Sequence, residues 1–234
     1  MSSPKSDHAI ALFKKMIATG RLKPGDRLPN EDEFSAQLGI SRNSMREAVR
    51  ALQAMQVLVA RQGDGTYVSS LEPSEMIQSL NFAVDVAGPE SVMNFLEVRK
   101  LIEVHAVEAA AIHRSEADLR KLTALHDSIL RLDDPEALIE LDSEFHQTIA
   151  GVGNNPVLTA LLKVVSGPTI RARIWRFRHA DQGFGALRRE HASILDAIKT
   201  RDVDAARYAM WGHVSGVQKW VEINLARMYK MEEG

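Results

Sequence analysis

The chain has 234 residues, of which 45% are apolar and 26% charged, a composition typical of a globular protein with room for one large domain or two ordinary ones. Its apolar runs are too short for a membrane-spanning helix, and the first residues, MSSPKSDHAI, lack the apolar segment of a signal peptide. We therefore expect a cytoplasmic protein without a membrane partner. The absence of cysteine excludes disulfides and thiolate ligands, so any metal must be held by nitrogen and oxygen atoms.

The formal net charge is −2, but the charge is unevenly distributed along the chain. Through residue 70 there are ten Lys and Arg against seven Asp and Glu, and in the remainder there are nineteen against twenty-four. A modestly basic first part followed by an acidic body favours a nucleic-acid-binding module joined to a domain of another kind.

The first seventy residues have the pattern of three helices followed by a β-hairpin. Asn30 and Ser41 can cap the starts of the second and third helices, while Gly20 and Gly39 suit the ends of the first and second. Short β-rich runs around a glycine-containing turn predict the hairpin. The helices are expected over residues 7–19, 31–38 and 42–55, and the hairpin over residues 57–70.

This order of elements is that of a winged helix-turn-helix, in which the third helix enters the major groove of DNA. Arg42, Arg46 and Arg50 recur at intervals of four on its exposed face, with Asn43 beside them. Arginine can bind phosphate or the edge of guanine, and asparagine can read a base or bind phosphate. A row of arginines alone would also suit a solvated basic face, but the adjacent turn, with Gly63, lets backbone approach a duplex closely. We therefore predict DNA binding by this domain, including a contact from Arg50.

Three motifs in this region resemble the DNA-binding domain of the GntR family of bacterial transcription regulators: the turn PGDRLP, the helix SR-x-x-x-REA and the wing G-x-G-T-x-V. The resemblance extends over roughly residues 8–69. Family members usually carry Arg in the second-helix motif E-R-E-L, where this chain has Asp32, so a positive phosphate contact is absent or replaced here. The resemblance implies that the recognition helix and the wing contact DNA through Ser41, Arg42, Asn43, Ser44, Arg46, Gln62 and Gly63.

Beyond residue 70, a short linker over residues 71–75 is expected to lead into a chain with long helical periodicity and hardly any strand pattern. Prolines and capping residues fall at the starts of most helices. The helices are expected over residues 74–87, 89–113, 115–131, 134–152, 155–178, 183–200 and 202–229. The fold class predicted is therefore mainly α, with a winged helix-turn-helix over residues 1–70 and an antiparallel all-α bundle over residues 76–234.

Four side chains in the predicted bundle have the chemistry of a metal site. Asp142 and His146 lie four residues apart on one helix, so their side chains can converge on a single point. An isolated pair of this kind is most simply a surface ion pair. However, His191 and His213 lie on or beside the apolar stripes of two other helices, and facing helices of bundles build metal sites in their interior. Imidazole and carboxylate together are usual ligands of zinc, nickel, manganese or iron, so the pattern favours a metal site.

The motifs D-x-x-F-H, E-H and G-H are similar to the metal-binding pattern of the FCD domain, the effector domain of the FadR-like branch of GntR regulators, over about residues 75–229. The resemblance implies one divalent metal ion per chain, with zinc favoured and nickel, manganese or iron as alternatives, and a small carboxylate effector such as a hydroxy acid or sugar acid. It implies effector contacts from Arg99, which can bind a carboxylate in a bidentate manner, and from Asn155, whose turn context also favours helix capping. The ligands implied are Asp142, His146, His191 and His213.

The arginine-rich stretch over residues 170–181 is expected to be mostly a solvated or dimer-facing surface. Arg171 or Arg173 within it has a position from which it could point into the pocket.

Together these features predict a ligand-responsive transcription regulator, expected to be a homodimeric repressor that binds double-stranded operator DNA. A metalloenzyme is the alternative, because three histidines and one aspartate on a helical scaffold also resemble the ligand set of iron and manganese superoxide dismutases. The recognition helix and wing argue against an enzyme, and no further general base with a defined role accompanies the ligands. A third hypothesis, an architectural DNA-binding protein with a purely structural metal, would require a closed site without an effector pocket.

Overall fold

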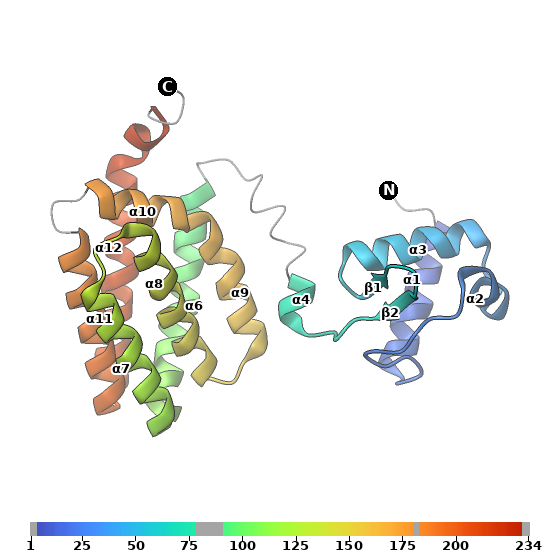
Figure 1. The fold of residues 1–234 in the computed structure, drawn as a ribbon, viewed down its shortest axis with the longest axis horizontal. Helices are drawn as coiled ribbons and strands as arrows, with labels where there is room; N and C mark the ends of the chain where they lie inside the picture. The colour runs from blue at the N-terminus through green and yellow to red at the C-terminus, as the bar shows by residue number, and fades with distance from the viewer. Residues whose placement is uncertain (1–3, 78–90, 180–182, 231–234) are drawn as a thin grey trace. The chain divides into compact units, whose positions relative to one another are not determined.

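The computed structural model describes residues 4–77, 91–179 and 183–230. The chain forms two compact units, Met1–Leu80 and Asn81–Gly234 (Figure 1). Within the described ranges, no helix combines the length and the apolar character needed to cross a membrane.

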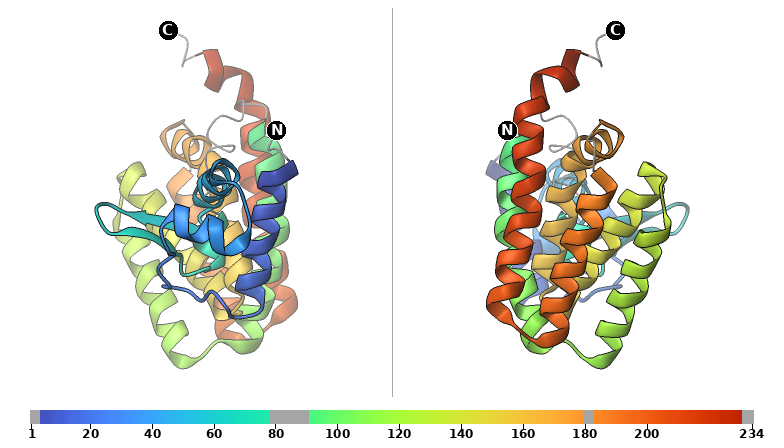
Figure 2. Two further views of the ribbon diagram at one scale, coloured as in Figure 1. Left: turned by 90° about the vertical axis from the view of Figure 1, so that its right-hand side faces the viewer. Right: turned by 90° about the vertical axis from the view of Figure 1, so that its left-hand side faces the viewer.

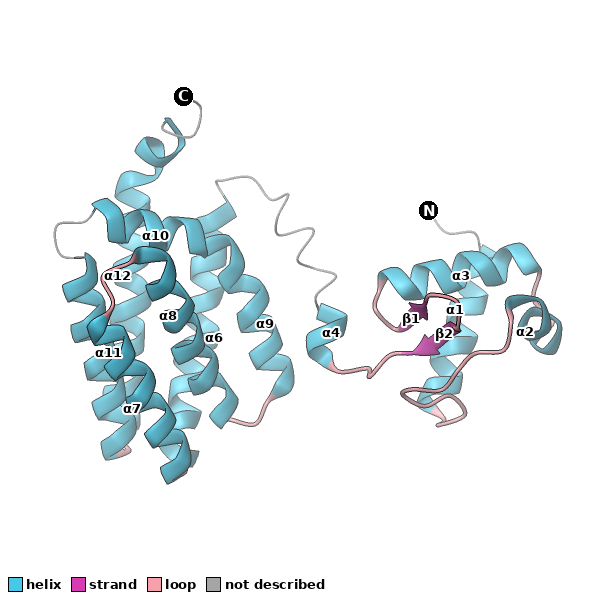
Figure 3. Ribbon diagram, in the orientation of Figure 1, coloured by secondary structure: helices cyan, strands magenta, loops and turns pink. Residues whose placement is uncertain are grey.

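The N-terminal unit consists of helices and one small antiparallel sheet (Figure 3). In the sheet Leu58 lies opposite Val68 and Arg61 lies opposite Gly65. Its elements are α1 (Pro4–Ala18), α2 (Glu31–Leu38), α3 (Arg42–Ala54), β1 (Leu58–Arg61), β2 (Gly65–Val68) and the short helix α4 (Pro73–Ile77). The mainly helical fold with a hairpin wing is therefore confirmed. The residues of the predicted linker from Pro73 onward lie in α4.

The helix boundaries in this unit follow from capping. The side chain of Asn30 accepts a hydrogen bond from the Glu33 backbone N–H at 2.8 Å and begins α2. Gly39 ends that helix in the left-handed conformation, with φ of 66°, which glycine adopts without steric cost. Between the helices, Phe13 and Phe34 pack edge to face with ring centroids 5.4 Å apart, and they fix α1 against α2 within the core.

The C-terminal unit is a helical bundle in which α6 and α12 run side by side (Figure 2). Its elements are α6 (Ser91–His113), α7 (Glu116–Arg131), α8 (Pro135–Val152), α9 (Pro156–Ser166), α10 (Ile170–His179), α11 (Gly183–Thr200) and α12 (Val203–Lys230). The expected helix over residues 74–87 is described only as far as residue 77, and the start of the next, at residues 89–90, lies outside the described residues.

The single helix expected over residues 155–178 is wrong. The chain instead forms α9, a 3-10 turn at Gly167–Thr169, and α10. Pro168 has no N–H to continue the helical hydrogen-bond ladder, and the preceding glycine has a low helix propensity. The break turns α10 across the end of the bundle, as Figure 1 shows, and this orientation carries Arg173 and Arg176 into the interior.

The bundle core is mostly apolar. Large side chains such as Leu122, Ile129, Leu138 and Phe145 are fully buried and pack in one continuous cluster. The buried charged and imidazole side chains of α6, α8, α10, α11 and α12 include Arg99, Glu103, Asp142, His146, Arg173, Arg176, His191 and His213. Burying such groups is costly unless they are paired or bind an ion, so their concentration identifies the candidate site.

Candidate metal centre and nucleic-acid interface

The four residues proposed as metal ligands converge from three helices of the bundle. Asp142 and His146 come from α8, His191 from α11 and His213 from α12, and each side chain is at most 3% exposed. One potential ligand atom of each residue lies within 4.8 Å of those of the other three. Residues separated by up to 71 positions in the sequence are thus brought to one point.

Three distances define the centre of this cluster. His146 Nε2 lies 3.1 Å from His213 Nε2, and His191 Nε2 lies 3.1 Å from Asp142 Oδ1. The distance from His146 Nε2 to the same Asp142 oxygen is 3.6 Å. All three histidines therefore present Nε2 to the centre, and Asp142 presents Oδ1.

The outer nitrogens of two histidines contact carboxylates. His213 Nδ1 lies 2.8 Å from Glu190 Oε2, and His146 Nδ1 contacts the carboxylate of Glu103. An ionised carboxylate only accepts hydrogen bonds, so His213 donates from Nδ1 and, when neutral, has its lone pair on Nε2. Burial lowers the pKa of His146, but Glu103 and Asp142 raise it by more, and the net shift is upward.

A single proton between His146 and His213 would not satisfy the cluster. Asp142 Oδ1 and His191 Nε2 are buried and form no hydrogen bond within the described part of the chain, although they lie close together. One cation at the centre would bind all four inward-facing atoms at once. The residues therefore fit a metal ion with nitrogen and oxygen ligands.

The protonation states also suit metal binding. Burial lowers the pKa of His191, and burial together with the two neighbouring imidazoles lowers the pKa of His213 well below its usual range, so both are neutral. Burial alone would raise the pKa of Asp142, but Arg173 and the facing imidazoles hold it well below normal. The centre thus offers an ionised carboxylate and two neutral imidazoles, from His191 and His213, which are the forms that coordinate metals, whereas His146 must lose its proton to bind one.

Two buried guanidinium groups border the centre. Arg99 of α6 bonds to Glu103, and Arg173 of α10 bonds to Asp142. Arg99 Nη1 and Arg173 Nε and Nη2 are buried without a hydrogen-bond acceptor among the described residues. Burial and the neighbouring Arg99 lower the pKa of Arg173 to about 10. Unsatisfied cationic donors of this kind are costly, and an anion with two oxygens would satisfy them.

Sequence reasoning assigned Arg99 to effector binding, and the structure places it beside the metal centre. Arg171 is exposed, whereas Arg173 faces the site. Asn155 is exposed at the start of α9, where its side chain accepts a hydrogen bond from Leu158 N–H at 3.1 Å. It acts as a helix cap, and an effector contact by Asn155 stays an untested prediction.

Two site residues, Glu103 and Glu190, were missed by sequence reasoning. Glu103 lies four residues after Arg99, a spacing that places both side chains on one helix face. Glu190 directly precedes His191 but contacts His213 instead. The Arg–Glu spacing could have identified Glu103, whereas no pattern in the sequence pairs Glu190 with a histidine 23 positions away.

The candidate DNA-binding face lies on α3 and the hairpin turn. Ser41 caps α3 by accepting a hydrogen bond from Ser44 N–H at 3.2 Å, and Ser44 is buried. The opposite stripe of α3 is buried as the periodicity predicts, through Met45, Ala48, Val49 and Leu52. The remaining candidate DNA contacts are exposed: Arg42, Asn43, Arg46, Arg50, Gln62 and Gly63.

Acidic residues of α2 pair with two of these arginines. Arg42 Nε lies 3.2 Å from Asp32 Oδ1, and Arg46 Nε lies 3.2 Å from Glu31 Oε2. All four side chains are largely exposed, so each pair contributes about 1 kcal/mol or less and can be released when DNA approaches. Asp32, where the resemblance led us to expect Arg, thus pairs with a recognition-helix arginine.

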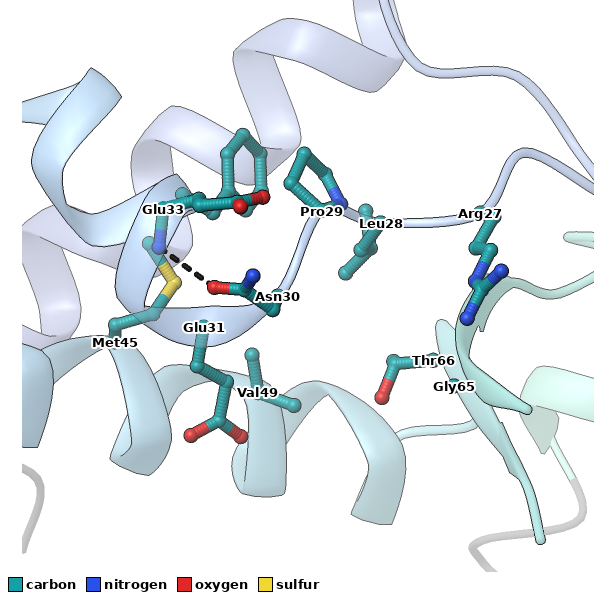
Figure 4. A pocket seen from close by; sticks show the side chains of 11 residues that line it. Arg27, Leu28, Pro29, Asn30, Glu31, Glu33, Met45, Val49, Gly65 and Thr66 are labelled. Atoms are coloured by element: carbon teal, nitrogen blue, oxygen red, sulfur yellow. Dashed lines mark hydrogen bonds between the residues drawn. The ribbon is translucent and has the colours of Figure 1, made fainter. Parts of the chain in front are cut away.

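A hollow of about 650 Å³ lies between α2, α3 and the wing (Figure 4). Arg27 borders it and donates a hydrogen bond to the Asp64 carbonyl oxygen. Gly65 has φ of 141°, a conformation that L side chains rarely adopt, and a Cβ there would lie 3.0 Å from Arg27 Nε, so glycine suits this position. Tyr67 donates to Asp64 Oδ2 at 2.7 Å. These contacts fix the wing turn, and we assign the hollow no ligand.

These parts define a DNA-binding regulator with a separate ligand-binding domain, and comparison with known proteins identifies its family. Residues 5–68 match the model "Bacterial regulatory proteins, gntR family", and residues 94–216 match the FCD domain. The chain belongs to the GntR family of bacterial transcription regulators. The resemblance inferred from the sequence motifs is confirmed.

Relatives and a solved structure agree with this assignment. The chain is 34% identical over 212 residues to the HTH-type transcriptional regulator LutR of Bacillus subtilis (strain 168), covering 87% of this chain and 94% of that protein. It is 30% identical over 219 residues to the putative L-lactate dehydrogenase operon regulatory protein of Escherichia coli (strain K12), covering 91% of this chain and 84% of that protein. The solved structure of Streptococcus agalactiae GntR aligns with a TM-score of 0.64 and 27% identity, over 94% of this chain and 99% of that one. The chain is thus a transcription regulator rather than an enzyme.

We predict that the full-length protein binds about one zinc ion per chain and that His191→Ala loses most of it, because the variant lacks one of four buried ligands. Elemental analysis after dialysis measures the metal content. His105→Ala removes an exposed histidine of α6 and should retain the metal. Equal metal content in His191→Ala and the wild type would contradict the site.

We predict that Asp32→Asn increases affinity for duplex DNA of random sequence, because it frees Arg42 and removes a negative charge near phosphates. If one additional phosphate is neutralised, the slope of log affinity against log salt concentration steepens by about 1. Fluorescence anisotropy over a series of salt concentrations measures the slope. Asp196→Asn, an exposed change in α11, is the control, and identical slopes for both variants would disprove this role of Asp32.

Proposed function

We propose that this protein is a homodimeric repressor whose affinity for operator DNA is weakened by a small hydroxy acid or sugar acid bound at the metal centre. The observation that carries this proposal is the set of buried, unpartnered guanidinium donors of Arg99 and Arg173 beside four convergent ligand atoms. One relative, 28% identical over 215 residues, is the galactonate operon transcriptional repressor of Escherichia coli (strain K12). Another relative is named as a putative L-lactate dehydrogenase operon regulatory protein. Both names contain an acid with an α-hydroxyl group.

Zinc is the metal proposed for Asp142, His146, His191 and His213, with nickel, manganese or iron as alternatives. When bound, the metal would supply a Lewis-acid centre that favours a carboxylate with an adjacent hydroxyl group over a carboxylate alone. The chain itself supplies the ligands, their orientation and an enclosed environment that excludes water.

Charge balance supports an anionic effector. Arg99 is paired with Glu103, and Arg173 is paired with Asp142, so these buried ion pairs are close to neutral. Adding a divalent cation leaves excess positive charge in a buried place, which is unfavourable. A carboxylate that accepts from the free donors of Arg99 and Arg173 offsets this charge.

The packing of α10 supports a connection between the site and the start of the bundle. Ala172, next to Arg173 in the sequence, packs with Val92 and Leu96 of α6 and with Val217 and Val221 of α12. Val92 is near the N-terminal end of α6, the first described helix after the segment that joins the two units. An anion that moves Arg173 therefore acts on the helix that begins nearest the DNA-binding domain in the chain.

The exposed apolar side chains of α6 and α12 support homodimer formation. Leu101 is 61% exposed, and Tyr208, Trp211 and Ile223 are 74%, 48% and 72% exposed. Apolar groups on two adjacent helices suit burial against a second copy. A two-fold dimer would present two recognition helices to a near-palindromic operator.

We predict that Arg46→Ala abolishes specific operator binding without unfolding the protein, because Arg46 is exposed and a bidentate contact to a base contributes roughly 1–3 kcal/mol of discrimination. A mobility-shift titration tests this on a duplex that wild type selects from a random library. Lys163→Ala, an exposed change in the bundle, should bind normally. Wild-type affinity in Arg46→Ala would refute the recognition-helix assignment.

We predict that lactate or galactonate binds the zinc-loaded protein and propionate, which lacks the hydroxyl group, binds more weakly. Arg99→Ala and Arg173→Lys should both bind the acid less tightly, because each removes a guanidinium donor. Isothermal calorimetry measures these affinities, and thermal denaturation shows whether the variants are folded.

The same acid should weaken operator binding by a coupling free energy of about 1–3 kcal/mol, and by linkage the operator should weaken acid binding by the same factor. Operator titrations with and without saturating acid measure the coupling. If none of a panel of hydroxy and sugar acids changes operator affinity, the sensor mechanism is wrong even though the DNA-binding assignment stands.

A further inference from the structure

Carboxylates contact the outer ring nitrogen, Nδ1, of two of the three histidines at the candidate metal centre, and the third histidine has no such contact among the described residues. Glu190 Oε2 accepts from His213 Nδ1 at 2.8 Å, and the Glu103 carboxylate forms an ion-pair contact with His146 Nδ1. His191 Nδ1 is buried with no hydrogen-bond partner in the described ranges. Its ring instead stacks on Phe145, with centroids 4.5 Å apart and planes 15° apart.

A carboxylate behind a metal-binding imidazole has two effects. It fixes the tautomer and the orientation of the ring, and it makes the inward-facing nitrogen more basic. Removal of such a partner typically weakens metal affinity by roughly 10–100-fold, although the ligand itself remains. A contact to Nδ1 can therefore change the metal affinity of the site although the contacting group does not bind the metal.

Glu190 reaches this position because it neighbours a ligand on the same helix. Successive residues of an α-helix point about 100° apart, so His191 faces the centre while Glu190 faces α12. Its second oxygen, Oε1, lies 3.6 Å from Arg176 Nη2 of α10. One carboxylate of α11 thus contacts a metal ligand on α12 and an arginine on α10.

The surroundings of Glu190 accommodate this arrangement. Gly216 lies three residues after His213 on α12, and a Cβ at Gly216 would lie 3.5 Å from Glu190 Oε1 and 3.9 Å from Arg176 Nη2. These are ordinary van der Waals distances, so Gly216 lies directly against the Glu190–Arg176 pair. Glu190 is 27% exposed, so its substitution is less disruptive than that of the fully buried Glu103, which also compensates Arg99.

We propose that Glu190 is a positioning residue of the metal centre, which holds His213 protonated at Nδ1 with Nε2 directed at the metal and connects this ligand to Arg176 on α10. This inference rests on the metal site of the proposed function. Glu103 has the same relation to His146, but Glu190 allows the cleaner test.

The experiment compares the full-length, metal-free wild type with Glu190→Gln and Glu190→Ala. Zinc affinity is measured by competition with a chromophoric chelator, and the visible absorption of the cobalt-loaded protein reports the ligand field. We expect a loss of zinc affinity of about 10–100-fold for Glu190→Ala and a smaller loss for Glu190→Gln, which keeps an acceptor but not the charge. The cobalt spectrum should shift in Glu190→Gln. Glu136→Gln, which alters an exposed carboxylate paired with Arg178, should behave as wild type.

The outcomes separate this inference from the function on which it rests. A wild type that binds neither zinc nor cobalt would remove the metal centre itself. A wild type that binds both, together with equal zinc affinity and identical cobalt spectra in the Glu190 variants, would overturn the positioning role alone. Weaker binding with an unchanged cobalt spectrum and an equally lowered melting temperature of the metal-free form would show a general structural role and would also overturn the inference. If Glu190→Ala does not fold, Glu190→Gln decides.

Discussion

The close approach of His146 Nε2 and His213 Nε2, at 3.1 Å, is the constraint on which the effector domain depends. Both outer nitrogens contact carboxylates, so the inner nitrogens of two imidazoles face each other in the interior of the bundle. Such an arrangement is costly without a cation at the centre. The apolar core around it keeps water out, and the outer carboxylates prevent the rings from turning away. The residues at the centre of the bundle therefore fit a cation.

The helix break at Gly167–Thr169 brings two arginines to this centre. A continuous helix from residue 155 to residue 178 would have kept the axis of α9. The arginines of residues 170–178 would then lie along that same axis. Because Pro168 interrupts the hydrogen-bond ladder, α10 crosses the end of the bundle and directs Arg173 at Asp142 and Arg176 at Glu190. The same helix packs through Ala172 against α6 and α12. A ligand that changes the position of α10 thus acts on two structural helices at once.

Local patterns predicted the elements well where a single physical rule applied. Asn30, Ser41 and Gly39 mark helix ends because their side chains or backbone angles satisfy groups that any helix leaves open. The convergence of His146, His191 and His213 was predictable because three inward faces of a bundle share one interior.

Contacts between side chains that are distant in sequence were not predictable in the same way. Glu190 is adjacent to His191, yet it serves His213, because the direction of a side chain across a helix interface depends on how α11 and α12 pack. Similarly, Arg171 and Arg173 are both plausible from the sequence, and only the orientation of α10 buries one and exposes the other.

The ion pairs of the recognition helix are exposed to water, whereas those of the candidate site in the bundle are buried. In the recognition helix, Arg42 and Arg46 pair with Asp32 and Glu31 in contact with water, where an ion pair contributes little and salt screens it. These pairs can exchange a carboxylate for a phosphate at small cost. In the bundle, the pairs of Arg99 and Arg173 are buried, and removing one partner leaves an uncompensated charge. The exposed pairs of the recognition helix thus suit an exchange of partners, whereas the buried pairs of the bundle hold a fixed pattern of charge.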